Sequence, residues 1–298
     1  MRMIPKTVLS LFCLVGLLPA CSSSEPAETA RPNIVVTYSV LGSVVADLVG
    51  DAADVTTLIP DGQDPHDFQP SARDIEAINN ADLVVSNGLD FEEGLEDVLA
   101  SAIDSGVSVY MIGENITVRE HDEDHAEEGG HAHGAGDPHL WLSPMSFAQA
   151  LPSLTAAINK ATGLSIDETA ALDQLTLLDN EIKEVIGSVS SCVLVSGHDE
   201  MGYFADRYGC TVIGAIIPSF STTSEATAKQ IADLKVLAAS KNVKAVFTGL
   251  GTPAEVSEQL ASELGIAAVS LSTHYLNGAA NYREFMLNLA NQIAEALR

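Results

Sequence analysis

Short apolar runs alternate along this chain with longer segments whose apolar residues recur at helical spacing. In the first half, the pattern predicts strands at 33–38, 55–59, 83–86 and 107–112, and helices at 42–49, 72–79 and 91–102. Ser71, with Asp74 three residues later, has the pattern of a helix-capping box at the start of 72–79. Strands that are separated by helices predict a mainly parallel sheet with helices on both faces.

The second half repeats this alternation after a long helical region. It predicts strands at 192–196, 211–217, 243–248 and 267–271, and helices at 200–208, 224–239, 253–264 and 282–297. The helix at 167–189 has one apolar face, and its length suits a connection between two lobes. We therefore predict an α/β protein with two lobes, each with a mainly parallel sheet flanked by helices, joined by a long rigid helix. The expected parts are an N-terminal lobe at 33–144, a connecting helical segment at 145–190 and a C-terminal lobe at 191–298.

The first 21 residues have the features of an export signal. Arg2 and Lys6 precede an apolar stretch at 8–18, which is too short for a comfortable membrane span. The following Leu18-Pro19-Ala20-Cys21 resembles a bacterial lipobox, in which Cys21 carries the lipid; cleavage of an ordinary signal peptide nearby is the alternative. Residues 22–32 then form a flexible tether. This predicts an exported, lipid-anchored protein in the periplasm or at the cell surface, without indicating which membrane holds the lipid.

Export changes the interpretation of the cysteines. Cys13 leaves with the signal and Cys21 is the lipid site, so Cys192 and Cys210 remain. In an oxidising compartment we expect these two to pair, because each would precede a strand and neighbouring parallel strands bring their starts together. Neither has a CxxC partner, which argues against a metal role.

Composition narrows the functional classes. An apolar fraction of 46% in 298 residues is enough for a packed core, and a formal charge of −27 argues against nucleic-acid binding. The same charge suits a protein that handles cations, although acidity often reflects only a solvated surface.

The eight histidines fall into two groups. His66, His139, His198 and His274 each lie near the end of a predicted strand or the start of a loop, where parallel sheets bind ligands. Imidazole suits zinc, which favours four tetrahedral ligands, so we predict a metal site in the cleft between the lobes. Asp64 and Asp137 each stand two residues before a histidine, where a carboxylate can orient the ring or shape its loop.

The other group lies in an acidic, glycine-rich stretch at 114–137, which we expect to be a mobile loop. Its histidines could capture zinc weakly and pass it to the cleft site, or sense its abundance, or have no effect on uptake. They are His121, His125, His131 and His133.

Three motifs resemble those of the zinc and manganese solute-binding proteins of bacterial ABC importers, the cluster A-I family with its ZnuA and TroA types. They begin at Asp64-Pro65-His66, at Asp137-Pro138-His139 and at His198-Asp199-Glu200, and the resemblance extends from Ile34 to Leu297. It implies that His66, His139 and His198 are metal ligands, and histidine at the third position resembles the zinc-type members. At the fourth position, where the family often has a carboxylate, our alignment places His274. A slip of one or two residues would place Ser272 there instead and leave a site of three histidines and water.

The resemblance implies a non-catalytic receptor with Zn²⁺ as its transported ligand. Its partners would be a membrane permease with its ATPase subunit, the membrane would be reached through the N-terminal lipid, and the receptor would be a monomer. A manganese receptor and a surface metal buffer or adhesin are the alternatives. A zinc hydrolase with Glu200 as base is a further class, but the chain lacks the HExxH motif of zinc proteases.

Overall fold

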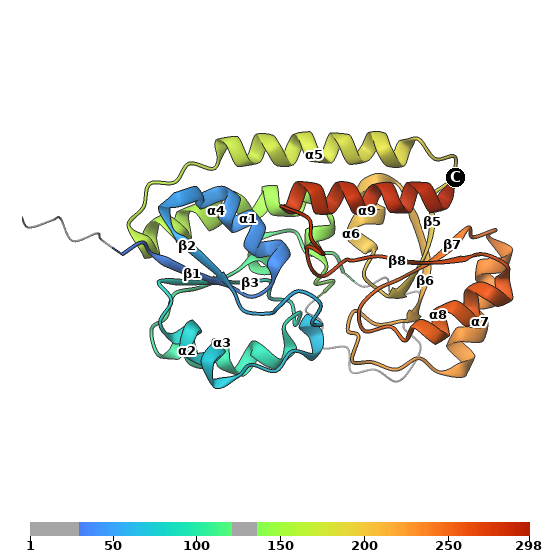
Figure 1. The fold of residues 1–298 in the computed structure, drawn as a ribbon, viewed down its shortest axis with the longest axis horizontal. Coiled ribbons are helices and arrows are strands. Elements are labelled where there is room, and N and C mark those ends of the chain that lie inside the picture. The colour runs from blue at the N-terminus through green and yellow to red at the C-terminus, as the bar shows by residue number, and fades with distance from the viewer. Residues whose placement is uncertain (1–29, 121–135) are drawn as a thin grey trace, which may run out of the picture. The chain divides into compact units, whose positions relative to one another are not determined.

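Four parallel strands form the sheet of the N-terminal lobe in the computed structural model, which describes residues 30–120 and 136–298. Their order is β2-β1-β3-β4. The strands are β1 (Asn33–Val36), β2 (Asp54–Thr57), β3 (Leu83–Ser86) and β4 (Val109–Met111). Helix α1 (Ser39–Val49) covers one face, and α2 (Ala72–Asn79) and α3 (Glu96–Asp104) cover the other (Figure 1).

Burial on both faces explains why these strands read as continuous apolar runs. Along β1, Ile34 and Val36 enter one apolar cluster, whereas Val35 points into another on the opposite face. All three side chains have no exposed surface. The sheet is therefore the middle layer of the lobe, and the parallel arrangement predicted from the sequence is confirmed.

The C-terminal lobe contains two parallel pairs of strands, β5–β6 and β7–β8, with β5 beside β7. The strands are β5 (Val193–His198), β6 (Thr211–Ile217), β7 (Ala245–Thr248) and β8 (Ala267–Ser270). The helices of this half are α6 (Gly202–Tyr208), α7 (Ala228–Ser240), α8 (Ala254–Leu264) and α9 (Tyr282–Leu297).

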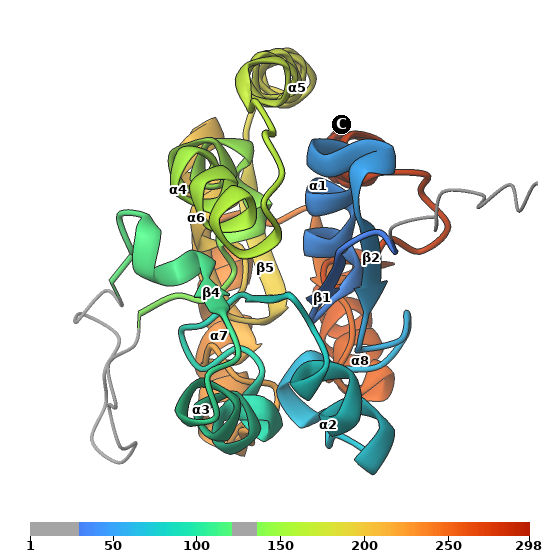
Figure 2. The same ribbon diagram turned by 90° about the vertical axis from the view of Figure 1, so that its left-hand side faces the viewer.

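The long helix α5 (Thr169–Gly187) runs along both lobes, and the last helix, α9, contacts both. After α4 (Pro144–Thr162), helix α5 extends over both and packs on α4 and α9 (Figure 1). Figure 2 views α5 end-on, outside α4 and α1. The last helix, α9, also contacts the N-terminal lobe: the Tyr282 backbone N–H donates to Ser43 Oγ of α1 at 2.8 Å. The largest apolar cluster accordingly includes side chains of both lobes, from Ile34 to Leu297.

Some element boundaries differ from the prediction for local reasons. The helix expected at 91–102 begins only at Glu96, because Leu89 and Asp90 adopt left-handed φ values of 59° and 58° and make a turn first. The helix expected at 224–239 begins at Ala228, where Thr227 and Gln230 form a reciprocal capping box.

The disulfide joins Cys192 to Cys210, with Cα atoms 4.6 Å apart. The cysteines directly precede β5 and β6, whose first residues, Val193 and Thr211, pair in register. Within 30–120 and 136–298, no helix has both the length and the apolar character to span a bilayer. The expected export signal with Cys21, and the four loop histidines at 121–133, lie outside the described residues.

Candidate metal centre

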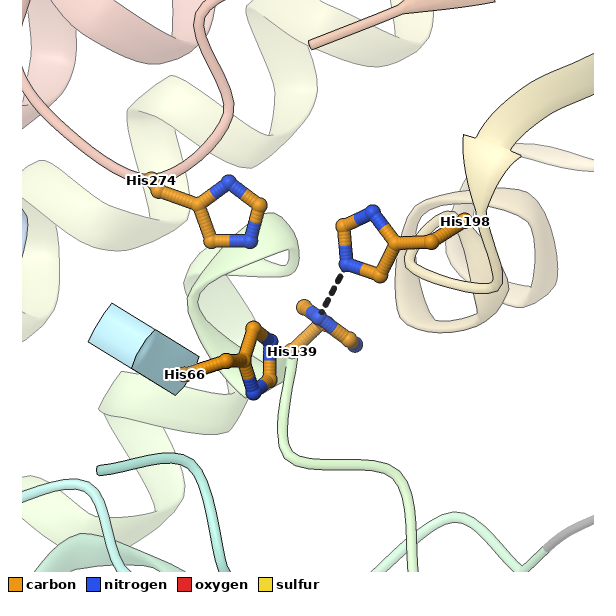
Figure 3. A group of neighbouring side chains, drawn as sticks. All are labelled: His66, His139, His198 and His274. Carbon is orange, nitrogen blue, oxygen red and sulfur yellow. Dashed lines mark hydrogen bonds between the residues drawn. The ribbon is translucent and has the colours of Figure 1, made fainter. Parts of the chain in front are cut away.

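Four histidine side chains meet between the two lobes (Figure 3). Each offers one ring nitrogen, and these nitrogens all lie within 4.8 Å of one another. Each ring is at most 2% exposed, and each comes from a different part of the chain. His66 lies in the 3-10 turn Pro65–Asp67, His139 precedes the turn Leu140–Leu142, His198 ends β5, and His274 follows β8.

The rings form a nearly regular tetrahedron. The distances between ring centroids range from 4.9 Å for His139 and His198 to 5.8 Å for the pairs of His274 with His66 and with His139. Nε2 of His139 lies 3.0 Å from Nε2 of His198. Zinc holds nitrogen ligands at about 2.0–2.1 Å, so tetrahedral ligand atoms stand about 3.3 Å apart. Small ring movements therefore suffice to place all four nitrogens around one ion.

Asp137 orients the ring of His139. Its Oδ1 accepts from the backbone N–H of His139 at 2.9 Å and lies 2.9 Å from the ring Nδ1. In the tautomer that donates from Nδ1, the lone pair of Nε2 points into the cluster. Asp137 thus acts on both the loop and the ring.

Asp64 acts on the loop alone. Its Oδ1 accepts from the backbone N–H of His66 at 3.1 Å and caps the 3-10 turn that begins with Pro65. Of the two roles that the sequence suggests for these aspartates, Asp64 fills only the shaping of its loop.

An aromatic wall fixes the other side of the cluster. The ring of His274 stacks on Phe91 with an interplanar angle of 11°, and His66 meets the same ring edge-on. Trp141 Nε1 donates to the carbonyl of Thr273 at 2.6 Å, which holds the loop before His274. This wall is not predictable from the sequence, because it depends on contacts between distant segments.

The histidines are neutral at physiological pH. Burial lowers the pKa of His139 to about 3, and burial with repulsion from neighbouring rings lowers those of His66, His198 and His274 well below the usual value. Both ring nitrogens of His66, Nδ1 of His198 and Nε2 of His274 have no hydrogen-bond partner within the described chain. Burying a polar atom without a hydrogen-bond partner is costly. A cation bound by these ring nitrogens would supply the missing partner, so the cluster has the features of a cation site.

The structure brings His274 into the cluster and keeps Ser272 out of it. The Ser272 hydroxyl donates to the carbonyl of Tyr275 at 2.8 Å and so closes its own turn.

A buried carboxylate flanks two of the histidines. Glu200 Oε1 lies 3.8 Å from Nδ1 of His198, and Oε2 lies 3.9 Å from Nε2 of His274. Burial raises the pKa of Glu200 to about 8. The sequence shows Glu200 in the third motif but cannot show that it lies beside two rings.

Hydroxyl groups of the C-terminal lobe contact the carboxylates near His66. Thr222 Oγ1 donates to Asp64 Oδ2 at 2.8 Å, and Ser221 Oγ donates to Glu93 Oε1 at 2.5 Å. Glu93 Oε1 is also 3.8 Å from Nδ1 of His66. The loop after β6 therefore closes one side of the centre across the two lobes.

Arg119 links α6 to the loop that carries His139. Its Nε donates to Asp206 Oδ2 of α6 at 2.9 Å, and its backbone N–H donates to the Tyr203 hydroxyl at 2.9 Å. Nη1 lies 3.7 Å from Asp137 Oδ2. A Cβ atom on Gly202 would lie 2.6 Å from this carboxylate, so the close approach of α6 requires glycine there.

The fold and the centre together define a two-lobed α/β protein with a metal-type histidine site between its lobes. The family model described as "Zinc-uptake complex component A periplasmic", ZnuA, matches residues 34–296, and the chain belongs to this family.

Two of the curated relatives match over most of both chains. A "Putative metal-binding protein" of Treponema pallidum (strain Nichols) is 27% identical, over 97% of this chain and 95% of its own length. The "High-affinity zinc uptake system protein ZnuA" of Bacillus subtilis (strain 168) is 28% identical, over 86% of this chain and 84% of its own. The "Zinc-binding protein AdcA" of Streptococcus pyogenes serotype M1 is 25% identical, but the chain spans only 56% of its length.

Solved structures show the same fold. The periplasmic zinc-binding protein TroA from Treponema pallidum superposes with a TM-score of 0.77 at 23% identity, over 90% of this chain and 99% of that one. A ZnuA crystal structure gives a TM-score of 0.76 at 24% identity, over 90% of this chain and all of that one.

Proposed function

We propose that the protein is the extracytoplasmic substrate-binding receptor of an ABC importer. It captures Zn²⁺ between its lobes and delivers the ion to a membrane permease that is driven by an ATPase subunit. The observation that carries this proposal is the tetrahedral cluster of four buried, neutral imidazoles. Family membership and the zinc-binding names of relatives support it.

The donor set favours zinc over manganese. The cluster consists of nitrogen donors, which suit zinc, whereas manganese prefers carboxylate, carbonyl and water oxygens. It also favours a receptor over a hydrolase. Catalytic zinc keeps one position open for water, whereas four imidazole ligands would leave no tetrahedral position for it.

The proposal also covers export, membrane attachment, oligomeric state and domain organisation. We propose export by the signal at 1–21, lipid attachment at Cys21, a tether at 22–32 and a monomeric receptor. The lobes at 33–144 and 191–298 and the connecting segment at 145–190 remain the proposed domains. We assign the loop histidines an auxiliary role in metal capture.

Metal titration tests the site. The protein from residue 22 onward, stripped of metal, is titrated with Zn²⁺ and with Mn²⁺ in competition with a chelator, beside His274→Ala and a deletion of residues 121–133. We expect one tight zinc site that survives the deletion and weakens in His274→Ala. Zinc binding that disappears with the loop, or tighter binding of manganese, would contradict a zinc-specific cleft.

An uptake assay tests delivery. Cells that carry the permease and ATPase but lack this protein should regain zinc accumulation with the wild-type receptor and not with His198→Ala at equal expression. Equal zinc accumulation with and without the protein would instead favour a surface buffer or adhesin.

A further inference from the structure

We propose that Glu200 is a positioning residue of the metal centre: its carboxylate holds His198 and lies against His274, and it sets the affinity of the site through these two rings. This inference rests on the proposed zinc-receptor function. It concerns a side chain outside the four-histidine cluster.

The backbone after β5 places the Glu200 side chain beside the rings of His198 and His274. The N–H of Glu200 donates to the carbonyl of His198 at 2.9 Å, and the N–H of Asp199 donates to the carbonyl of Ser219 at 3.0 Å. The first bond closes a tight turn at the end of β5, and the second ties this turn to the loop after β6. As a result the Glu200 side chain is only 2% exposed although it belongs to a connection between β5 and α6.

The carboxylate faces one nitrogen of each ring. Nε2 of His198 points at His139 and is the ligand atom, so Nδ1 is free to act as a donor toward Oε1 of Glu200, 3.8 Å away. Oε2 lies 3.9 Å from His274 Nε2 and has no hydrogen-bond partner in the part of the chain that the structure describes. Hydrogen bonds from nitrogen to oxygen measure about 2.7–3.2 Å, so a ring movement of about 1 Å would make the bond to His198.

The two rings face each other beside the carboxylate. They are stacked, with centroids 5.2 Å apart and planes 20° apart. The Thr273 hydroxyl bonds to Glu200 and lies 3.1 Å from Nδ1 of His274, which ties the carboxylate to the second ring as well.

A carboxylate in this place has a defined chemical effect. Histidine ligands of zinc usually donate their other ring N–H to a carboxylate, which fixes the tautomer and makes the ligand more basic. Asp137 does this for His139. Glu200 is placed to do it for His198 once the ring is drawn onto the ion.

The test compares Glu200→Gln and Glu200→Ala with the wild type and with Glu263→Gln. Glu263 is an exposed carboxylate that pairs with Lys235 on the surface, so its variant has the same chemical substitution away from the site. Zinc affinity is measured by chelator competition, and the visible absorption of Co²⁺-loaded protein reports the ligand set.

We expect zinc affinity to fall about 10- to 100-fold in Glu200→Ala and less in Glu200→Gln, with an unchanged Co²⁺ spectrum and no effect of Glu263→Gln. An altered Co²⁺ spectrum would make Glu200 a ligand and overturn the positioning role, as would unchanged affinity in both variants. Thermal melting of the metal-free variants tests whether they fold. If Glu200→Ala does not fold, the comparison rests on Glu200→Gln. A wild-type protein that binds no zinc would contradict the proposed function itself, which separates the two failures.

Discussion

Removal of one hydroxyl from the loop after β6 should speed zinc release. In Thr222→Val the side chain keeps its size but loses the bond from Oγ1 to Asp64 Oδ2, which spans 2.8 Å between the lobes. Asp64 in turn holds the turn that carries His66. Loss of this contact therefore loosens both the closure of the lobes and one ligand.

The structure sets the size of the effect. A hydrogen bond to a charged group contributes about 1.5–3 kcal/mol, and because both groups are only half-buried we take about 1–2 kcal/mol. That energy corresponds to zinc release that is about 5- to 30-fold faster, since each 1.4 kcal/mol is a factor of ten.

Stopped-flow mixing of zinc-loaded protein with excess chelator measures this rate. Thr211→Val is the matched control, because Thr211 is an exposed residue at the start of β6. Release within twofold of the wild-type rate in Thr222→Val, or equal acceleration in the control, would refute the role of the cross-lobe contact.

Three further predictions concern the support of the site and of the fold. In Asp137→Asn, the ring of His139 loses its carboxylate partner. Chelator competition should show about 10- to 100-fold weaker zinc binding. Asp179→Asn weakens a pair of bonds from Arg207 between α5 and α6, and denaturant unfolding at pH 7 should show a loss of about 1–3 kcal/mol. Burial alone would raise the pKa of Asp179, but its bonds with Arg207 and a lysine outweigh burial and lower it, so the carboxylate stabilises the fold above its unfolded pKa. The difference between Asp179→Asn and the wild type should therefore shrink as the pH falls below about 4; a constant difference would show that charge is not its source. Cys192→Ser opens a link to Cys210 across 18 positions, and calorimetry should show a loss of about 3 kcal/mol that dithiothreitol reproduces in the wild type.

The sequence predicted the elements well wherever local pattern decides them. The alternation of strands and helices, the capping box at Ser71 and the last helix from Tyr282 all appear in the structure. It failed at the start of α3, because the left-handed turn at Leu89 and Asp90 involves residues with no strong preference for that conformation.

The candidate site, too, was predictable from the sequence only in part. Motifs at strand ends selected three of the clustered histidines, since parallel strands deliver their carboxyl ends to one edge, but at the fourth position they left His274 and Ser272 as alternatives. The contacts of Glu200, Thr222 and Arg119 were not predictable, because each joins segments whose relative placement depends on packing across both lobes.

The spacing of the four histidines has a consequence for assembly. The intervals between positions 66, 139, 198 and 274 are dozens of residues long, and the last histidine lies just before α9, which packs on both lobes. In a small zinc finger, ligands that are close in sequence let the metal drive local folding, but here closing such long loops in an unfolded chain is entropically costly. A folding chain would therefore present no complete four-histidine site until its final helix had docked. Tight zinc binding would then require the completely folded chain. Because the ion binds the native state and not the unfolded one, it would stabilise the whole native state by mass action.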